Sequence, residues 1–337
     1  MQRLGKNTVK FDHPPSVIGF ASIASKKEAE GPMAGYIDIL NDDPMFGQQT
    51  WEKAESQMQR DVAEKALGKA SLDPGKIEYL FAGDLLNQCI GSHYGLLEIG
   101  IPFAGLYSAC ATMAEGLALA SVFVESKAAE RAMVVTSSHF CSSERQYRFP
   151  LEYGGQRTPT SQWTVTGAGA AILGCGDVPP FVKAMTIGTI VEKGVKDLNN
   201  MGAAMAPAAA LTLKQYFEDT VTNEDNFDLI VTGDLAHVGS QLLYELMERD
   251  RYDLRGKHAD CGLLIYDREK QDVNSGGSGC GCSATVLCSY ILNSMKTGKL
   301  NEVLFVATGA LMSPTSVQQG QSIPGIAHLV HLSTQKE

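Results

Sequence analysis

The strongest constraint on the fold is that the chain repeats one succession of strands and helices. The segments IEYLFAGDL (77–85) and FDLIVTGDL (227–235) are both apolar strand patterns that end in Gly-Asp-Leu. Further on, ERAMVVTSS (130–138) and NEVLFVATGA (301–310) are again apolar strand patterns. Matches that recur in the same order indicate a duplicated unit. The chain is therefore predicted to consist of two similar halves.

Helical patterns follow the same repeat. A long helical pattern precedes the second strand of each half, at 108–120 and at 279–292. Strands that alternate with helices form parallel sheets covered by helices on both faces, so the fold class is α/β. Two prolines in CGDVPP (175–180) interrupt regular structure there. We therefore expect an N-terminal half at 1–178 and a C-terminal half at 179–337.

Composition excludes several classes of protein. Lys and Arg total 28 and Asp and Glu total 38, a net charge of −10; this disfavours nucleic acid as a partner, since phosphate-backbone binders are basic. Residues 1–15 lack the apolar run of a signal peptide. The most apolar stretch, 103–124, is interrupted by Glu115, so no transmembrane segment is expected. Eight irregularly spaced cysteines fit a reducing compartment better than a disulfide framework.

Three segments carry a resemblance to the thiolase and ketoacyl synthase superfamily. ALGKASLDPGKIEYL (66–80) resembles its helix-turn-strand entry, SACATMAEGLALA (108–120) its nucleophile elbow, and TGAGAAILG (166–174) its central Gly-Ala strand. The resemblance implies a thiolase-like fold, in which the two duplicated halves form a five-layered α-β-α-β-α sandwich. It also places Cys110 at the reactive position.

The whole chain resembles, more closely, the stage V sporulation protein AD family. Characteristic segments include AGDLLNQ (82–88), HADCGLLIY (258–266) and GGSGCGCSA (276–284). That family is implicated in the uptake of dipicolinic acid (pyridine-2,6-dicarboxylate) into the developing spore, beside membrane proteins of the stage V sporulation A system. The resemblance therefore implies a peripheral protein on the cytoplasmic side of the forespore or spore inner membrane, and a homodimer.

Cys110 is the first candidate for chemistry. It lies between the apolar segment FAGLYSA (103–109), interpreted as a strand, and a helical run. The unpaired N–H groups of a helix N-terminus lower the pKa of a thiol and stabilise the thiolate, so Cys110 is a candidate nucleophile, vestigial or acyl-accepting. The alternative is a small apolar residue packed at a turn.

The remaining machinery of a condensing enzyme is not recognisable. Carbon–carbon condensation requires donors for developing negative charge, which members of the superfamily supply as two histidines or a His and an Asn. Here Asp234 stands where such a histidine is expected, and GGSGCGCSA (276–284) contains no Asn. We therefore expect that condensation is lost or very slow.

Two histidines remain candidates for a catalytic base. His258 precedes the apolar segment CGLLIY (261–266), interpreted as a strand, with Asp260 as a possible partner, and His139 follows the strand pattern at 130–138. For each, a hydrogen-bonded structural histidine is an open alternative. Cys280, in a C-x-C pair, is the second-half counterpart of Cys110 and is expected near the same pocket. That spacing disfavours zinc, and neither a metal site nor a cofactor is expected.

A dicarboxylate ligand needs cations or oriented donors. Arg145, Arg148 and Arg157 lie among aromatic residues in SERQYRFPLEYGGQR (143–157), where arginine could hold a carboxylate and an aromatic ring could stack on a pyridine. The alternative is a surface loop held by Arg–Glu pairs. Further candidate ligand-binding residues are Asp84, Asn87, Cys110, Asp234, His258 and Cys280. If the ligand arrives as a calcium chelate, Asp84 or Asp234 could reach the metal.

Three functions follow from these interpretations. The first is a non-condensing thiolase-fold protein that binds dipicolinic acid in the former active-site cleft. The second is an acyl-transfer enzyme with Cys110 as nucleophile. The third is a dimeric interaction platform for membrane channel subunits of the spore.

Overall fold

A computed structural model describes residues 1–147 and 157–336. Arg148, one of the predicted ligand-binding residues, therefore lies outside the described residues. The candidate boundary near residue 178 falls in the connection between two strands, β9 (Gly167–Gly174) and β10 (Phe181–Thr186).

The N-terminal half contains the helices and strands up to β9. In chain order they are β1 (Gln2–Leu4), β2 (Thr8–Lys10), β3 (Ser16–Ser25), α1 (Lys26–Ala29), η1 (Ala34–Tyr36), β4 (Ile39–Asn41), α2 (Trp51–Ala70), η2 (Pro74–Lys76), β5 (Tyr79–Gly83), η3 (Asn87–Cys89), α3 (Ile90–Leu96), η4 (Leu97–Ile99), β6 (Phe103–Gly105), α4 (Thr112–Glu125), β7 (Arg131–Ser138), α5 (Phe140–Tyr147), β8 (Trp163–Thr164) and β9.

The C-terminal half repeats much of this order. Its elements are β10, α6 (Met201–Thr220), η5 (Glu224–Asn226), β11 (Leu229–Thr232), α7 (Ala236–Arg249), β12 (His258–Asp260), α8 (Cys261–Leu264), β13 (Gly277–Ser278), α9 (Cys280–Val286), the π-helical turn η6 (Leu287–Ile291), α10 (Leu292–Lys296), β14 (Glu302–Ala310), α11 (Pro314–Gln318) and β15 (Gly325–Ser333).

The strand order shows the duplication directly. Hydrogen-bonded neighbours run β12-β11-β14-β15-β10-β3-β9-β7-β5-β6. Outward from the junction, β3-β9-β7-β5-β6 in one half corresponds to β10-β15-β14-β11-β12 in the other. β5 pairs in parallel with β6 and β7, and β11 pairs in parallel with β12 and β14. The two Gly-Asp-Leu repeats of the sequence therefore follow equivalent strands.

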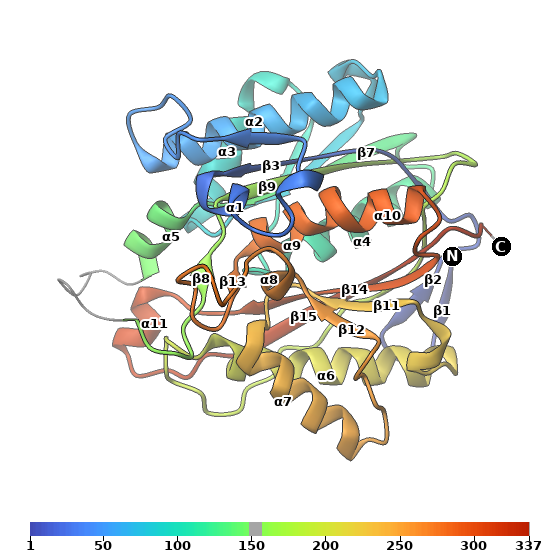
Figure 1. The fold of residues 1–337 in the computed structure, drawn as a ribbon. Helices are drawn as coiled ribbons and strands as arrows, with labels where there is room; N and C mark the ends of the chain where they lie inside the picture. Colours follow the sequence, from blue (N-terminus) through green and yellow to red (C-terminus); the bar gives the residue numbers. More distant parts are fainter. Residues whose placement is uncertain (148–156, 337) are drawn as a thin grey trace.

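Five layers stack in Figure 1. α2 and α3 cover the outer face of the first sheet, α6 and α7 cover the outer face of the second, and α4, α9 and α10 lie between the two sheets. The predicted α/β fold of five layers is confirmed.

The middle layer is closely packed because its contact residues are small. A Cβ atom added at Gly169 of β9 would lie 2.4 Å from the carbonyl oxygen of Ala284 in α9. A Cβ atom at Gly281 would lie 2.2 Å from the carbonyl oxygen of Gly167. Glycine at these positions lets the central helix approach the sheet backbone, which brings the start of α9 close to the end of the first sheet.

Two local predictions were wrong. The segment 261–266 is not a strand: the strand is β12, and the Asp260 side chain accepts a hydrogen bond from the Gly262 backbone N–H at 3.0 Å, which caps the short helix α8. The predicted strand at 103–109 is also shorter, since β6 ends at Gly105 and the chain then enters the turn that carries Cys110.

Candidate functional site: the Cys110 cavity

Cys110 lies on a tight turn between β6 and α4. Ala109 has a φ of 48°, in the left-handed region that non-glycine residues seldom adopt. The Thr112 hydroxyl donates to the Ala109 carbonyl at 2.7 Å and accepts from the Ser108 backbone N–H at 3.1 Å. A Cβ atom at Gly309 of β14 would lie 2.5 Å from the Ser108 carbonyl oxygen. The turn is thus held by the end of a strand of the other half.

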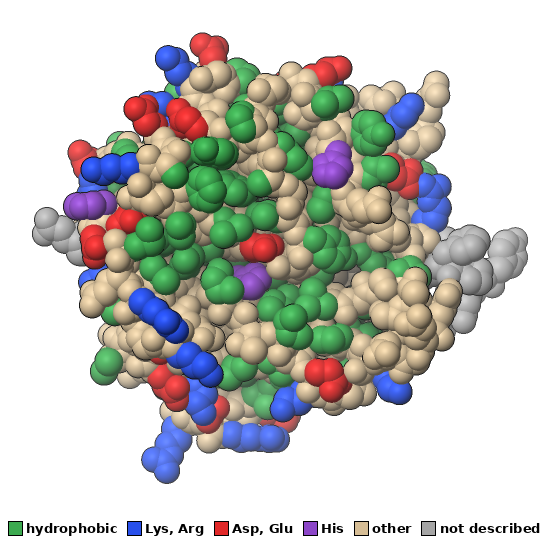
Figure 2. All heavy atoms as spheres, turned by 180° about the vertical axis from the view of Figure 1, so that it is seen from behind, with side chains coloured by type: hydrophobic (Ala, Val, Ile, Leu, Met, Phe, Trp, Pro, Cys, Tyr) green, Lys and Arg blue, Asp and Glu red, His purple; other side chains and the backbone are tan. Residues whose placement is uncertain are grey.

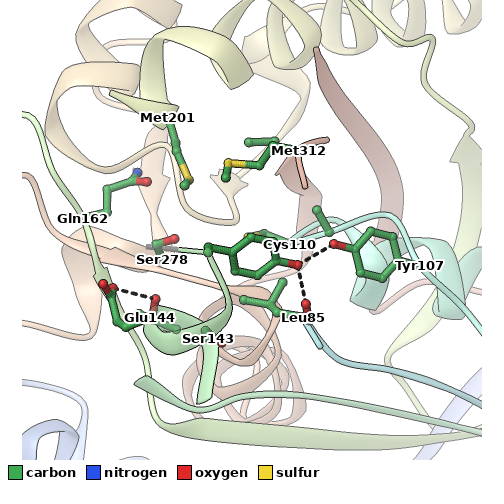
Figure 3. A pocket seen from close by; sticks show the side chains of 13 residues that line it. Leu85, Tyr107, Cys110, Ser143, Glu144, Gln162, Met201, Ser278 and Met312 are labelled. Atoms are coloured by element: carbon green, nitrogen blue, oxygen red, sulfur yellow. Dashed lines mark hydrogen bonds between the residues drawn. The ribbon is translucent and has the colours of Figure 1, made fainter. Parts of the chain in front are cut away.

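The cavity at Cys110 is lined by residues of both halves. Its free space is about 50 Å³, enough for only a few water molecules. Figure 3 shows Met201 and Met312 side by side across the cavity from Ser143, with Gln162 and Tyr107 on opposite sides. The lining residues are Leu85, Tyr107, Ala109, Cys110, Ser143, Glu144, Tyr147, Gln162, Thr164, Met201, Ser278, Ala310 and Met312.

Two tyrosines close one side of this cavity. The hydroxyl oxygens of Tyr107 and Tyr147 are 2.7 Å apart, and the Tyr147 hydroxyl also donates to the Leu85 carbonyl oxygen (Figure 3). Tyr107 is 43% exposed, so the pair lies between the cavity and the protein surface. A ligand larger than a few waters can enter only if these rings or the methionines move.

Asp234 is the acidic group at the thiol. It follows β11 and is fully buried. Its carboxylate accepts from the Gly279 backbone N–H at 2.9 Å and from the Thr308 hydroxyl at 2.7 Å, and it also interacts with the Cys110 thiol. Burial raises the pKa of Asp234. The structure therefore places a buried carboxyl group beside the Cys110 thiol.

The environment of Cys110 opposes thiolate formation. Burial first, and then the neighbouring Asp234 and Cys280, raise the pKa of the Cys110 thiol well above its usual value. The pKa of Cys110 is therefore raised, whereas the sequence predicted that the helix N-terminus would lower it.

This environment predicts slow alkylation of Cys110. Cys175 is exposed, whereas Cys110 is 7% exposed, and the thiolate is the reactive species. With iodoacetamide at pH 7.5, Cys175 should be modified at least about tenfold faster than Cys110 in the folded protein. Peptide mass mapping over time measures both rates. Preferential modification of Cys110 would show an activated thiol instead.

Cys280 and Cys110 are brought together. Cys280 begins α9, is fully buried, and shares an apolar cluster with Cys110 and Leu85. Its sulfur donates to the Ser137 carbonyl oxygen at 2.8 Å. Gly279 before it has a φ of 109°, a conformation that glycine permits. Cys280 is thus near the predicted place, but it is covered and is not part of the cavity lining.

Neither candidate histidine lines the cavity. His258 on β12 has Nε2 2.8 Å from the Thr232 hydroxyl and Nδ1 2.9 Å from the Tyr244 hydroxyl, and burial lowers its pKa to about 4. His139 donates from Nε2 to the Pro44 carbonyl oxygen at 2.8 Å. It borders a different hollow. No histidine is found among the described residues that line the Cys110 cavity.

Asp84 is a buried structural carboxyl. It accepts from the Leu86 backbone N–H at 2.8 Å and from the backbone N–H and hydroxyl of Ser92 at 2.7 and 2.6 Å. In residues 1–147 and 157–336, no three His, Cys, Asp or Glu side chains form a metal-binding group. Asp84 and Asp234 therefore both accept hydrogen bonds from protein donors in this structure.

Asn87 and Arg145 border a separate surface hollow. The Asn87 backbone N–H donates to Gln146 at 2.9 Å, and the half-exposed Arg145 forms an ion pair with Glu52. Neither residue lines the Cys110 cavity. Of the predicted ligand-binding residues within the described part of the chain, the structure thus gathers Cys110, Asp234 and Cys280, and leaves Asp84, Asn87, Arg145 and His258 elsewhere.

Several cavity residues were not predicted from sequence. Tyr107 is only three residues before Cys110, so its position beside the elbow was a usable signal. Gln162 directly precedes β8 and Thr164 ends it, and this strand is too short to give a clear periodic pattern in the sequence. Met201 and Met312 look like ordinary core residues in the sequence. Only the packing of the two halves brings these side chains together.

The fold and the elbow define a class. The structure of cerulenin-bound OleA from Xanthomonas campestris matches with a TM-score of 0.62 and 14% identity, over 98% of this chain and 100% of that one. The 3-oxoacyl-[acyl-carrier-protein] synthase III structure from Aquifex aeolicus matches with a TM-score of 0.59 and 12% identity, over 95% and 99%. The chain thus has the thiolase-like ketosynthase fold.

Sequence comparison identifies the family. The model of the stage V sporulation protein AD family matches residues 5–333. Stage V sporulation protein AD of Bacillus subtilis (strain 168) is 44% identical over 330 residues, which cover 97% of each chain. This chain belongs to the stage V sporulation protein AD family. Within the described residues, no helix has the length and apolar character needed to span a bilayer.

Proposed function

We propose that this protein binds dipicolinic acid in the Cys110 cavity and does not catalyse condensation. One observation carries the proposal: a member of a sporulation family keeps the cavity at the elbow cysteine, while the described lining contains no imidazole. Condensation requires groups that stabilise enolate and oxyanion charge. A carboxyl group in the position of Asp234 destabilises negative charge instead.

The cavity offers the groups that an aromatic acid requires. Tyr107 and Tyr147 provide ring faces and hydroxyl donors, and the two methionines provide an apolar wall. Glu144 lines the cavity, and Asp234 lies behind the lining, beside the Cys110 thiol. A free dicarboxylate therefore meets repulsion that a calcium chelate, with its charge neutralised, avoids. This contrast supports the calcium chelate as the form that binds more tightly.

Equilibrium binding tests the proposal. Titration calorimetry with dipicolinate, with and without calcium, should show saturable binding to one site per chain. Isophthalate, which has the same two carboxylates but lacks the ring nitrogen needed for chelation, is the matched control and should bind more weakly. Absence of saturable binding in both conditions would refute the proposal.

Acyl transfer is a second candidate, because Asp234 lies at the thiol. The Cys110 thiol could pass its proton to the Asp234 carboxylate while the sulfur attacks a thioester carbonyl. The tetrahedral adduct then expels the leaving group as a thiolate, which takes the proton back from Asp234. Neither His258 nor His139 is placed to act as this base. Incubation with a panel of acyl-thioesters followed by intact-mass measurement should reveal a Cys110 adduct if this function exists, and the Cys110→Ala variant should remain unmodified.

We further propose that the protein is a homodimer that works beside membrane proteins of its sporulation system. β6 is the terminal strand of the sheet order, and large apolar side chains are exposed on α3, η4 and β6. They are Ile90, Tyr94, Leu97 and Phe103. A terminal strand with an apolar surround favours pairing with another chain. Figure 2 shows that hydrophobic side chains also gather across the middle of the rear face. Sedimentation equilibrium measures the oligomeric state.

A peripheral position at the spore inner membrane also remains part of this proposal. Its support is the family to which the chain belongs. Fractionation of sporulating cells tests it: a peripheral protein should sediment with membranes and be released by high salt without detergent.

A further inference from the structure

Arg157 lies behind the wall of the Cys110 cavity, and one edge of its guanidinium group, formed by Nε and Nη2, is only partly hydrogen-bonded. Its Nη2 donates to the Gln162 carbonyl oxygen at 2.6 Å and to Glu144 Oε1 at 3.3 Å. Its Nε is buried and has no hydrogen-bond partner within the described part of the chain. A buried N–H group without a partner is costly. This guanidinium therefore has an unused donor.

Aromatic side chains fix the plane of this guanidinium. The centre of the Arg157 guanidinium lies 5.2 Å from the ring centroid of Trp163 and 5.6 Å from that of Phe140. The two rings are stacked, with centroids 4.0 Å apart. An arginine held in this way is preorganised for planar recognition of a carboxylate through two parallel N–H groups.

Glu144 separates Arg157 from the cavity. Glu144 lines the cavity, whereas Arg157 contacts Glu144 and is not itself part of the lining. The pair is long for a charge-assisted hydrogen bond, which is usually about 2.7–2.9 Å. Thr164 adds a still longer contact to the same oxygen, at 3.5 Å. The carboxylate of Glu144 thus balances the charge of Arg157 but accepts a hydrogen bond only from Nη2 and not from Nε.

We propose that a carboxylate of the ligand displaces Glu144 and binds Arg157 through Nε and Nη2, so that Glu144 is an internal competitor that sets affinity. This inference rests on the proposed function, because it takes the ligand to be an aromatic carboxylate. It assigns the carboxylate-binding role to Arg157. Arg145 is a weaker candidate for this role, because it forms a surface ion pair with Glu52.

The two members of the pair should have opposite effects on binding. Glu144→Gln removes the competing charge, so the dipicolinate affinity should rise by about tenfold. Arg157→Gln removes the two donors, so the affinity should fall by on the order of 30-fold. In the double variant, Glu144→Gln should give no gain, because the cation for which it competes is gone. Arg145→Gln is the matched control and should leave the affinity unchanged.

The test is titration calorimetry of calcium-free dipicolinate and picolinate against all five proteins, each checked for cooperative thermal unfolding. A merely structural pair would weaken binding in both single variants, and that result would overturn the inference. So would an Arg157→Gln variant that binds as the original protein does, while the proposed function would stand. Binding by the original protein to neither acid would overturn the proposed function. If the Glu144→Gln variant also binds neither acid, the inference about Arg157 is refuted together with the proposed function.

Discussion

Replacing Ala310 by Trp is expected to abolish dipicolinate binding, with a loss of affinity of about 100-fold or more. Ala310 ends β14, is 6% exposed and lines the Cys110 cavity. The free space there is about 50 Å³, so an indole ring would fill it and leave no room for a second ring. The cost to stability should stay within about 1–3 kcal/mol, as is usual for overpacking beside a partly open site. Titration calorimetry measures the loss of binding.

Two further variants make this result specific. Met312→Trp fills the same cavity from another residue and should have the same effect. Leu211→Trp adds an indole on the exposed side of α6, at a residue that is 41% exposed, and should bind normally. Normal binding by both cavity-filling variants, with thermal unfolding intact, would place the ligand elsewhere on the protein.

The duplication could be predicted from sequence because it is written in local patterns. The strands that end at Gly83 and Thr232 carry the same Gly-Asp-Leu signature, and the structure gives them equivalent positions in the sheet order. Periodicity and turn residues are sufficient for such features. The elbow at Cys110 was instead predicted from the resemblance of 108–120 to the superfamily, and in the structure a short strand, a turn and a helix follow one another there.

The cavity wall could not be predicted in this way. Glu144 lies on α5 and Gln162 directly precedes β8, two short elements on either side of a segment without periodic apolar residues. The role of His258 was equally hidden, because its partner Tyr244 lies on α7 and only the folded chain brings the two together. Likewise, the pKa of Cys110 depends on Asp234, a residue of the other half. These features depend on long-range contacts that no local pattern specifies.

Glu55 should make the protein less stable as the pH rises. Glu55 of α2 is fully buried, and its two carboxyl oxygens accept from Ser137 at 2.9 Å and Ser142 at 2.8 Å. Burial first, and then nearby Asp84, raise its pKa to about 8. Between its ordinary pKa of 4.5 and 8, the folded chain keeps a proton that the unfolded chain has released. The stability that Glu55 contributes is therefore complete below 4.5 and lost as the pH approaches 8.

Glu55→Gln should remove this dependence, because an amide is neutral at every pH and still reaches both serines. At pH 8 the variant should be more stable than the original protein by about 2–4 kcal/mol, and at pH 5 the two should be nearly equal. Urea unfolding at both pH values measures the difference. Burial lowers the pKa values of His258 and His328 to about 4, so these two residues make stability rise with pH. They do so equally in both proteins and therefore leave the difference between the two proteins unchanged. Glu64→Gln, at an exposed residue of the same helix, is the control. A gain at pH 8 no larger than that at pH 5 would show that Glu55 is ionised in the folded protein, and that the charge beside Asp84 is balanced by its hydrogen bonds.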